Sequence, residues 1–190
     1  MIPTDTDLLL ATYEKVPTEG GSHLTFDITV IKSLKTGEIS IVIWRRTTLM
    51  IRELQKADID KVADIWLNTN VTAHYFISKQ YWQNNFELVK ELLLQATVYV
   101  YEDNQEIQGF IGLNDEYIEG IFVSNEMQSH GIGKALLNYA KNKRNKLFLN
   151  VYQKNIRAIA FYQREGFEIQ HSSFDEATEE KEYVMKWQQK

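Results

Sequence analysis

A glutamine and two glycines have the spacing of a phosphate-binding turn: Gln128, Gly131 and Gly133 stand directly before an amphipathic run of residues. Such a turn between a strand and a helix leaves backbone N–H groups free, and the positive end of the helix dipole attracts an anion. Glycine also lets a ligand approach the backbone closely, because it has no Cβ. The spacing indicates a diphosphate site, although a simple turn explains Gly131 equally well.

Two other phosphate motifs do not fit this stretch. A P-loop needs glycine at position 128 and serine or threonine at position 135, where Gln128 and Ala135 stand. A dinucleotide fingerprint needs a small residue at position 136, where Leu136 stands, and an earlier parallel βαβ start. The pattern before the glycines is an antiparallel meander, so this second motif fails as well.

A second stretch, "LFLNVYQKNIRAIAFYQREGFEI", supplies a strand, a polar corner at Asn155, a helix with Tyr162, and an exit at Gly166. A phenol with an ordinary pKa near 10 stays protonated at neutral pH and can donate its proton to a leaving group. Tyr162 is a phenol of this kind. The alternative is a tyrosine that only fills space between helix and sheet.

Composition excludes several classes of protein. The chain has 190 residues, which suits one main domain, and its net charge of −5 disfavours nucleic acid as the partner. It has no cysteine, which rules out thiolate chemistry and Cys-based metal sites, and its four histidines show no ligand pairing, so no metal is expected. No stretch has the roughly 18 apolar residues of a membrane helix. We expect a cytoplasmic protein that does not bind membranes.

The chain divides near Met50, and residues 50–190 alternate between helix and strand. Asp58 is expected to cap a first helix that buries Val62 and Trp66. Further helices are expected at 80–95, 131–145 and 156–165. Strands are expected at 51–54, 97–103, 107–115, 117–125 and 147–153, with a last one at 182–187 after an acidic stretch. This order predicts an α/β (α+β) domain with a mixed sheet.

Residues 1–49 form a separate N-terminal extension. Two strands, 23–33 and 38–44, are joined by a turn around Thr36 and Gly37 and predict a β-hairpin. Because an isolated hairpin is marginally stable, it packs on the main domain, pairs with another chain, or is an appended segment without a partner. The sequence does not choose among these.

The two chemical stretches together resemble the GCN5-related N-acetyltransferase (GNAT) superfamily. The resemblance spans Ile51 to Trp187, and its specific part runs from Tyr117 to Phe167. The segments "HYFISKQYW" and "NVYQKN" are most similar to small bacterial acetyltransferases that include a protein-lysine branch. The resemblance implies the acyl-CoA N-acyltransferase fold, a mixed, mostly antiparallel sheet with splayed central strands flanked by helices, and acetyl-CoA as cosubstrate.

The resemblance also implies roles for particular residues. Ile121, Phe122 and Val123 match the splayed strand that binds the pantetheine arm, and the oxyanion donor is expected to be a backbone N–H near Phe122. Asn155 matches a further cofactor contact. Tyr162 matches the tyrosine aimed at the sulfur, which makes it the candidate catalytic acid. The diphosphate is expected on the loop and first helical turn, which are Gln128, Ser129, His130, Gly131, Ile132, Gly133 and Lys134. Many relatives have a basic residue where Ser129 and His130 stand, so Lys134 is expected to compensate.

The remaining roles have open alternatives. Glu119 is the candidate base, because it stands two residues before Ile121 and strand alternation puts both on one face. The alternatives are that Glu119 is a solvated strand residue and that a relayed water serves as the base. His74 and Phe76 are candidate substrate contacts or a packing cluster. The acidic stretch near Glu179 either steers a lysine-rich acceptor or is a solvated loop.

The sequence therefore predicts an acetyl-CoA-dependent N-acetyltransferase that acts by direct transfer to a primary amine, such as a protein lysine. A small-molecule amine acetyltransferase and a non-catalytic CoA-binding or protein-interaction module are the alternatives. The chain is expected to be a monomer or a homodimer.

Overall fold

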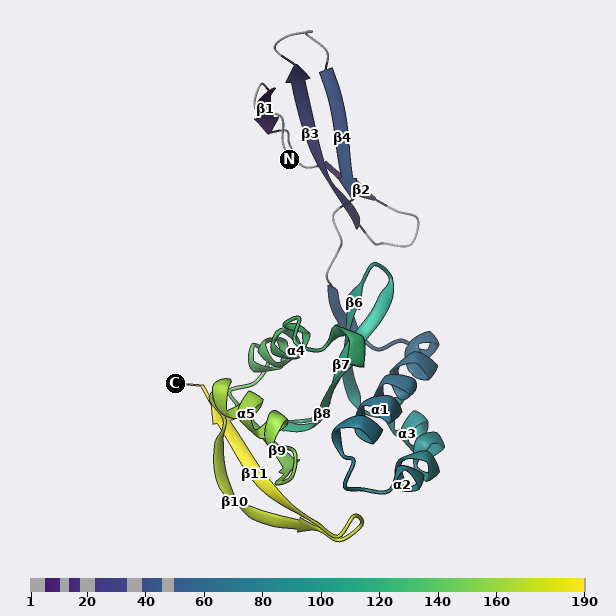
Figure 1. Cartoon of the computed structure of the whole chain (residues 1–190), viewed down its shortest axis with the longest axis vertical. Helices are drawn as coiled ribbons and strands as arrows, with labels where there is room; N and C mark the ends of the chain where they lie inside the picture. Colours follow the sequence, from purple (N-terminus) through teal and green to yellow (C-terminus); the bar gives the residue numbers. More distant parts are fainter. Residues whose placement is uncertain (1–5, 11–13, 18–22, 34–38, 46–49, 190) are drawn as a thin grey trace. The chain divides into compact units, whose positions relative to one another are not determined.

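The computed structural model describes residues 6–10, 14–17, 23–33, 39–45 and 50–189. The chain consists of two compact units, Met1–Leu49 and Met50–Lys190. Figure 1 shows the elements of both units in sequence colours. Among the described helices, none is long and apolar enough to cross a membrane.

The first unit is a small antiparallel sheet built around one long strand. β3 (His23–Ser33) pairs with β4 (Ile39–Arg45), in a register that matches Phe26 with Arg45. β1 (Thr6–Leu10) and β2 (Glu14–Pro17) pair with opposite ends of β3, so the described part of this unit has more strands than the expected hairpin. The expected turn at Thr36 and Gly37 lies outside the described residues.

The second unit contains a sheet that, within residues 50–189, has seven strands in the order β10-β11-β9-β8-β7-β6-β5. All neighbours in it are antiparallel except β8 and β9, which are parallel. The strands are β5 (Met50–Glu53), β6 (Thr97–Asp103), β7 (Glu106–Asn114), β8 (Tyr117–Val123), β9 (Lys146–Tyr152), β10 (Glu168–Asp175) and β11 (Glu180–Gln188). This is the mixed, mostly antiparallel sheet that the sequence predicts.

The meander β6-β7-β8 follows from alternating apolar residues and a tight turn. Asn104 and Gln105 connect β6 to β7, and both have positive φ, 52° and 67°, as in the two-residue turns that match strand twist. β10 was not expected from the sequence. Most of its residues are exposed, and it forms as a strand because it pairs along its length with β11.

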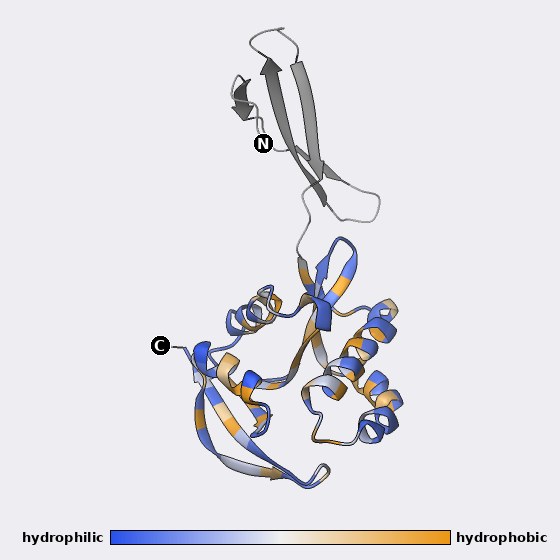
Figure 2. Ribbon diagram, in the orientation of Figure 1, coloured by the Kyte–Doolittle hydropathy of each residue, from blue (hydrophilic) through white to orange (hydrophobic). Residues whose placement is uncertain are grey.

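Helices cover both faces of the sheet (Figure 1). One apolar cluster of the second unit lies under α4 (Ile132–Lys141) and α5 (Ile156–Arg164), with Leu136 and Leu149 almost fully buried. The other lies under α1 (Ile59–Ala73) and α3 (Phe86–Leu93) and includes Val62 and Phe110. The ribbon of Figure 2 accordingly shows apolar and polar residues alternating along these helices, as an amphipathic helix requires.

Two expectations about the helices change in detail. The helix expected at 80–95 is two helices, α2 (Lys79–Asn84) and α3, because the chain leaves helical geometry at Asn85. Asp58 does precede α1, but its carboxylate does not cap that helix. It accepts hydrogen bonds from Arg52 Nη1 at 2.6 Å and from the N–H of Gln55 at 2.8 Å, and so ties β5 to the start of α1.

We expect a chain that begins at Met50 to fold by itself, because Met50–Lys190 is a compact unit whose described residues form two apolar clusters of their own. Its midpoint of urea unfolding should equal that of the corresponding transition in the full chain. A lower midpoint, or aggregation at micromolar concentration, would contradict this and show that residues 1–49 cover apolar surface of the second unit.

Candidate active site

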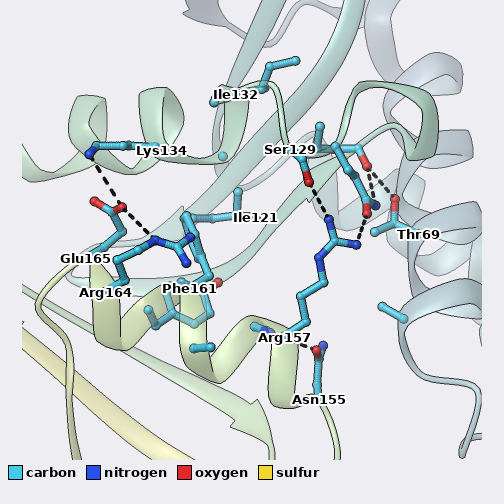
Figure 3. A pocket seen from close by; sticks show the side chains of 18 of the residues that line it. Thr69, Ile121, Ser129, Ile132, Lys134, Asn155, Arg157, Phe161, Arg164 and Glu165 are labelled. Atoms are coloured by element: carbon cyan, nitrogen blue, oxygen red, sulfur yellow. Dashed lines mark hydrogen bonds and ion pairs between the residues drawn. The ribbon is translucent and has the colours of Figure 1, made fainter.

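A groove of about 650 Å³ opens beside the C-terminal half of β8 (Figure 3). Its walls come from α1, the loop after β8, the start of α4 and one face of α5. The predicted cofactor residues that line it are Ile121, Val123, Gln128, Ser129, Gly131, Ile132, Gly133, Lys134, Asn155 and Tyr162. Tertiary structure thus gathers residues from three separate segments into one cavity.

The groove exists because β8 and β9 diverge. In the described sheet, their parallel register is the single pair Tyr117 with Phe148, close to the start of both strands. Beyond that pair, β9 no longer covers the edge of β8. This confirms the splayed central strands that the family resemblance implies.

The exposed edge of β8 presents the backbone of Ile121 and Val123. The N–H of Ser124 donates to the carbonyl of Gln108 on β7 at 2.8 Å. Because hydrogen-bonded and non-bonded pairs alternate in an antiparallel ladder, the N–H of Phe122 also points to β7, toward its partner Phe110. The N–H of Phe122 itself therefore faces away from the groove, and the neighbouring N–H groups of Ile121 and Val123 face it. The ring of Phe122 stacks on Phe110 with centroids 4.9 Å apart.

The loop before α4 has the geometry of an anion site. Ser129 and Gly131 both have positive φ, 68° and 85°, and α4 then begins at Ile132. Gly131 occupies the N-cap position and offers no side chain to the first N–H groups of α4, so these remain available to a ligand. An added Cβ at Gly131 would meet no atom within 4 Å, which shows that glycine is needed here for its φ and not for space.

Asn155 is held from two sides. Its side-chain oxygen accepts the N–H of Ala158 at 3.1 Å and caps α5, and its Nδ2 lies 3.1 Å from His74 Nε2. His74 Nδ1 lies 3.0 Å from Asn70 Oδ1, an atom that only accepts, so Nδ1 carries the proton and Nε2 accepts from Asn155. A hydrogen-bonded chain thus runs from α1 to the first turn of α5.

His74 is enclosed by aromatic rings. Its ring centroid lies 5.0 Å from that of Tyr152, 5.4 Å from Trp82 and 5.7 Å from Phe76. Burial lowers the pKa of His74 to about 4, so the imidazole is neutral at pH 7. These rings are what the alternative of a packing cluster predicts for His74. Its hydrogen bond with Asn155 orients that side chain at the groove. A contact of His74 or Phe76 with substrate stays a prediction.

Tyr162 lies on α5, lines the groove and is 8% exposed. Burial, with a smaller effect from Tyr117, raises the pKa of Tyr162 above its ordinary value. Burial, together with Glu182 and Glu119, raises the pKa of Tyr117 to about 12. Both phenols therefore keep their protons at neutral pH, as an acid at this site must.

Glu119 does not share a face with Ile121 through simple alternation. The register of β7 with β8 passes from Gly112–Gly120 to Leu113–Ile118, so Glu119 is the extra residue of a bulge. As a result Ile118 and Ile121 both pack against the cluster under α4 and α5, while Glu119 is exposed and does not line the groove. Its role as the base stays a prediction.

Positive charge reaches the groove from α4 and from α5. Lys134 lies 3.8 Å from Glu165, while His130 is exposed, bonds to the carbonyl of Gln128 at 3.0 Å, and does not line the groove. Arg157 crosses from α5 to the loop (Figure 3). The sequence analysis did not single out Arg157. Its spacing of four residues from Phe161, which also lines the groove, puts both side chains on one face of α5.

Comparison with known proteins agrees with this fold. The profile "Acetyltransferase (GNAT) domain" matches residues 95–169. Peptidyl-lysine N-acetyltransferase YiaC of Escherichia coli (strain K12) is 34% identical over 140 residues, which cover 73% of this chain and 96% of YiaC.

Two solved structures share the fold. The solution structure of the apo form of Escherichia coli YjaB has a TM-score of 0.68 at 22% identity and covers 75% of this chain and 99% of its own. The structure of YncA from Salmonella typhimurium with its cofactor acetyl-CoA has a TM-score of 0.54 at 18% identity, covering 75% and 95%. The chain belongs to the GNAT family and is an N-acetyltransferase.

Neutral His74 should make the stability of this protein depend on pH. Its pKa of about 4 lies below the ordinary 6.5, so between these values the unfolded chain binds a proton that the folded protein does not. Its contribution to stability is complete above pH 6.5 and falls toward pH 4, by at most about 1.4 kcal/mol per pH unit. Urea unfolding of the wild type and His74→Gln at pH 7 and pH 5 tests this. The free energy of unfolding of the wild type should exceed that of the variant by less at pH 5 than at pH 7, and the same excess at both pH values would contradict the prediction.

Substitutions at Gly133 should affect ligand binding without affecting folding. An added Cβ would lie 3.7 Å from the ring of Phe161 and 3.9 Å from Val123 Cγ2, which are ordinary contacts with side chains that line the groove. We expect Gly133→Val to keep the melting temperature yet weaken acetyl-CoA binding at least about tenfold, because its methyl groups enter the groove. Gly133→Ala is the matched control with a smaller loss, and unchanged calorimetric binding by both variants would contradict the assignment.

Proposed function

We propose that this enzyme transfers the acetyl group of acetyl-CoA directly to the ε-amine of a lysine in a protein or peptide. The observation that supports it best is the joining of three features in one groove: an uncovered strand edge, an open helix N-terminus and a protonated tyrosine. The peptidyl-lysine activity named for YiaC supports the choice of acceptor.

The groove suits the cosubstrate from end to end. The pantetheine amides would pair with the backbone of Ile121 and Val123 as an added strand does, and the diphosphate would lie on the N–H groups at the start of α4. Asn155, which follows the end of β9, would donate or accept one further hydrogen bond beyond the parted strands. Each of these groups already lines the same cavity.

The acetyl thioester supplies an activated carbonyl to the acceptor amine. As the new C–N bond forms and the C–S bond breaks, Tyr162 would give its phenolic proton to the departing sulfur. The N–H groups of Ile121 and Val123 are the donors that could stabilise the oxyanion, because they face the groove. A raised pKa keeps Tyr162 protonated for this step.

A base must remove the ammonium proton of the acceptor. Two carboxylates near Tyr117 are candidates for this role, those of Glu119 and Glu182. Glu182 is half-buried and accepts a hydrogen bond from Asn150 Nδ2 at 2.8 Å, whereas Glu119 is exposed on its bulge. Burial raises the pKa of Glu182 toward the range that suits a base at neutral pH. The fixed position and the raised pKa favour Glu182.

The wall beside His74 suits a lysine side chain. The ammonium of the chain's own Lys154 lies 5.3 Å from the centroid of Phe76 and 2.7 Å from a carboxylate oxygen of Glu180. An aromatic ring and a carboxylate side by side stabilise an ammonium and its aliphatic stem. The same wall is joined to the cofactor groove through His74 and Asn155.

We expect Tyr162→Phe to bind acetyl-CoA as the wild type does, because it keeps the ring, and to lose turnover about 100-fold or more, because no acid remains. Initial rates of CoA release with a lysine peptide, alongside calorimetric binding, separate the two effects. Equal turnover by the variant would remove the acid role. Turnover with spermidine but not with lysine peptides would move the small-amine alternative to first place.

A further inference from the structure

Arg157 reaches across the mouth of the groove. It belongs to the first turn of α5, and its guanidinium donates to Gln128 Oε1 at 2.7 Å and to Ser129 Oγ at 3.1 Å (Figure 3). Both partners are on the loop that precedes α4. One cation from α5 therefore lies at the place where the loop itself lacks a basic residue.

The other cations of the groove are partly neutralised. Lys134 lies 3.8 Å and Arg164 lies 4.0 Å from the same carboxylate, that of Glu165. The described partners of Arg157 are a neutral amide and a hydroxyl, and among the residues that the structure describes no carboxylate lies within 4.0 Å of its nitrogens. Arg157 thus carries the least compensated positive charge of the groove wall.

Gln128 links Arg157 to the strand edge. Its Nε2 donates to the carbonyl of Val123 at 3.2 Å, and the hydroxyl of Thr69 on α1 lies 3.4 Å from that same carbonyl. Arg157 therefore lies at the junction between the loop, where a diphosphate fits, and the strand edge, where a pantetheine fits. A guanidinium there can donate two parallel hydrogen bonds to phosphate oxygens. These charge-assisted bonds are stronger than the hydrogen bonds that the neutral side chains of Gln128 and Ser129 can donate to the same oxygens.

We propose that Arg157 binds the diphosphate of the CoA cosubstrate and replaces the basic residue that the loop lacks at Ser129 and His130. This rests on the proposed use of acetyl-CoA. When the diphosphate enters, the guanidinium exchanges Gln128 and Ser129 for phosphate oxygens with a small rotation of its side chain. The residue is a binding residue, and the chemistry at Tyr162 does not involve it.

The test is calorimetric titration of wild type and Arg157→Gln with a series of shortened ligands: acetyl-CoA, its 3′-dephospho form, and acetyl-pantetheine, which has no phosphate. We expect the Kd of the variant to rise by the same factor, about 10- to 100-fold, for the first two ligands, and to be unchanged for acetyl-pantetheine. Arg157→Lys, which keeps the charge but not the paired donors, should give an intermediate loss.

The matched control is Arg144→Gln. It removes the same charge from an arginine that bonds to the carbonyl of Asp115 and does not line the groove, and its Kd for acetyl-CoA should equal that of the wild type. Equal melting temperatures of the variants show that the fold is intact.

Three results would overturn the assignment: an unchanged Kd of Arg157→Gln for acetyl-CoA, an equal loss for acetyl-pantetheine, or a loss that disappears with the 3′-dephospho ligand. The last would assign Arg157 to the 3′-phosphate instead. No binding of acetyl-CoA by the wild type would instead contradict the proposed function itself.

Discussion

The separation of β8 from β9 is the constraint on which the rest of this enzyme depends. Two parallel strands that stay paired would satisfy each other's backbone groups, whereas here the register ends after Tyr117 and Phe148. The carbonyl of Val123 must then find other partners, because a buried backbone group without a hydrogen bond is costly. Gln128 and Thr69 provide them in this structure, and an extended ligand with amide groups can do the same. The uncovered edge thus explains both the polar side chains around it and the kind of ligand it suits.

Packing on the two faces of the sheet keeps the groove in place. α4 and α5 share one apolar cluster, and α1 and α3 share the other, so the groove lies between helices anchored to opposite faces. The hydrogen bonds from Asn70 through His74 to Asn155 connect these two layers. His74 also contacts Phe76 and Tyr152. The aromatic side chains around His74 are therefore connected through it to Asn155, the residue that caps α5.

Burial sets the charges of this site. It lowers the pKa of His74 and raises the pKa of Tyr162, which leaves both groups neutral at pH 7. The charged groups lie farther out, at Lys134, Arg157 and Arg164 along the groove and at Glu180 and Glu182 on β11. Much of the acidic stretch serves the fold, since Asp175 accepts hydrogen bonds from Tyr152 and Thr178, each at 2.7 Å, and Glu180 pairs with Lys154. A neutral centre between basic and acidic margins suits a reaction that joins an anionic cosubstrate to a cationic acceptor.

The sequence by itself determined the order of most elements, the mixed sheet, and the two stretches around Gly131 and Tyr162 that meet in the groove. These features follow from local rules, since periodicity predicts helices and strands and glycine marks a turn with positive φ. Tertiary structure decided the rest. The bulge at Glu119 shifts the faces of β8, pairing with β11 makes a strand of the polar segment β10, and packing turns His74 toward Asn155. Each of these depends on a partner distant in the chain, and so does the reach of Arg157 to Gln128, which no local pattern of residues records.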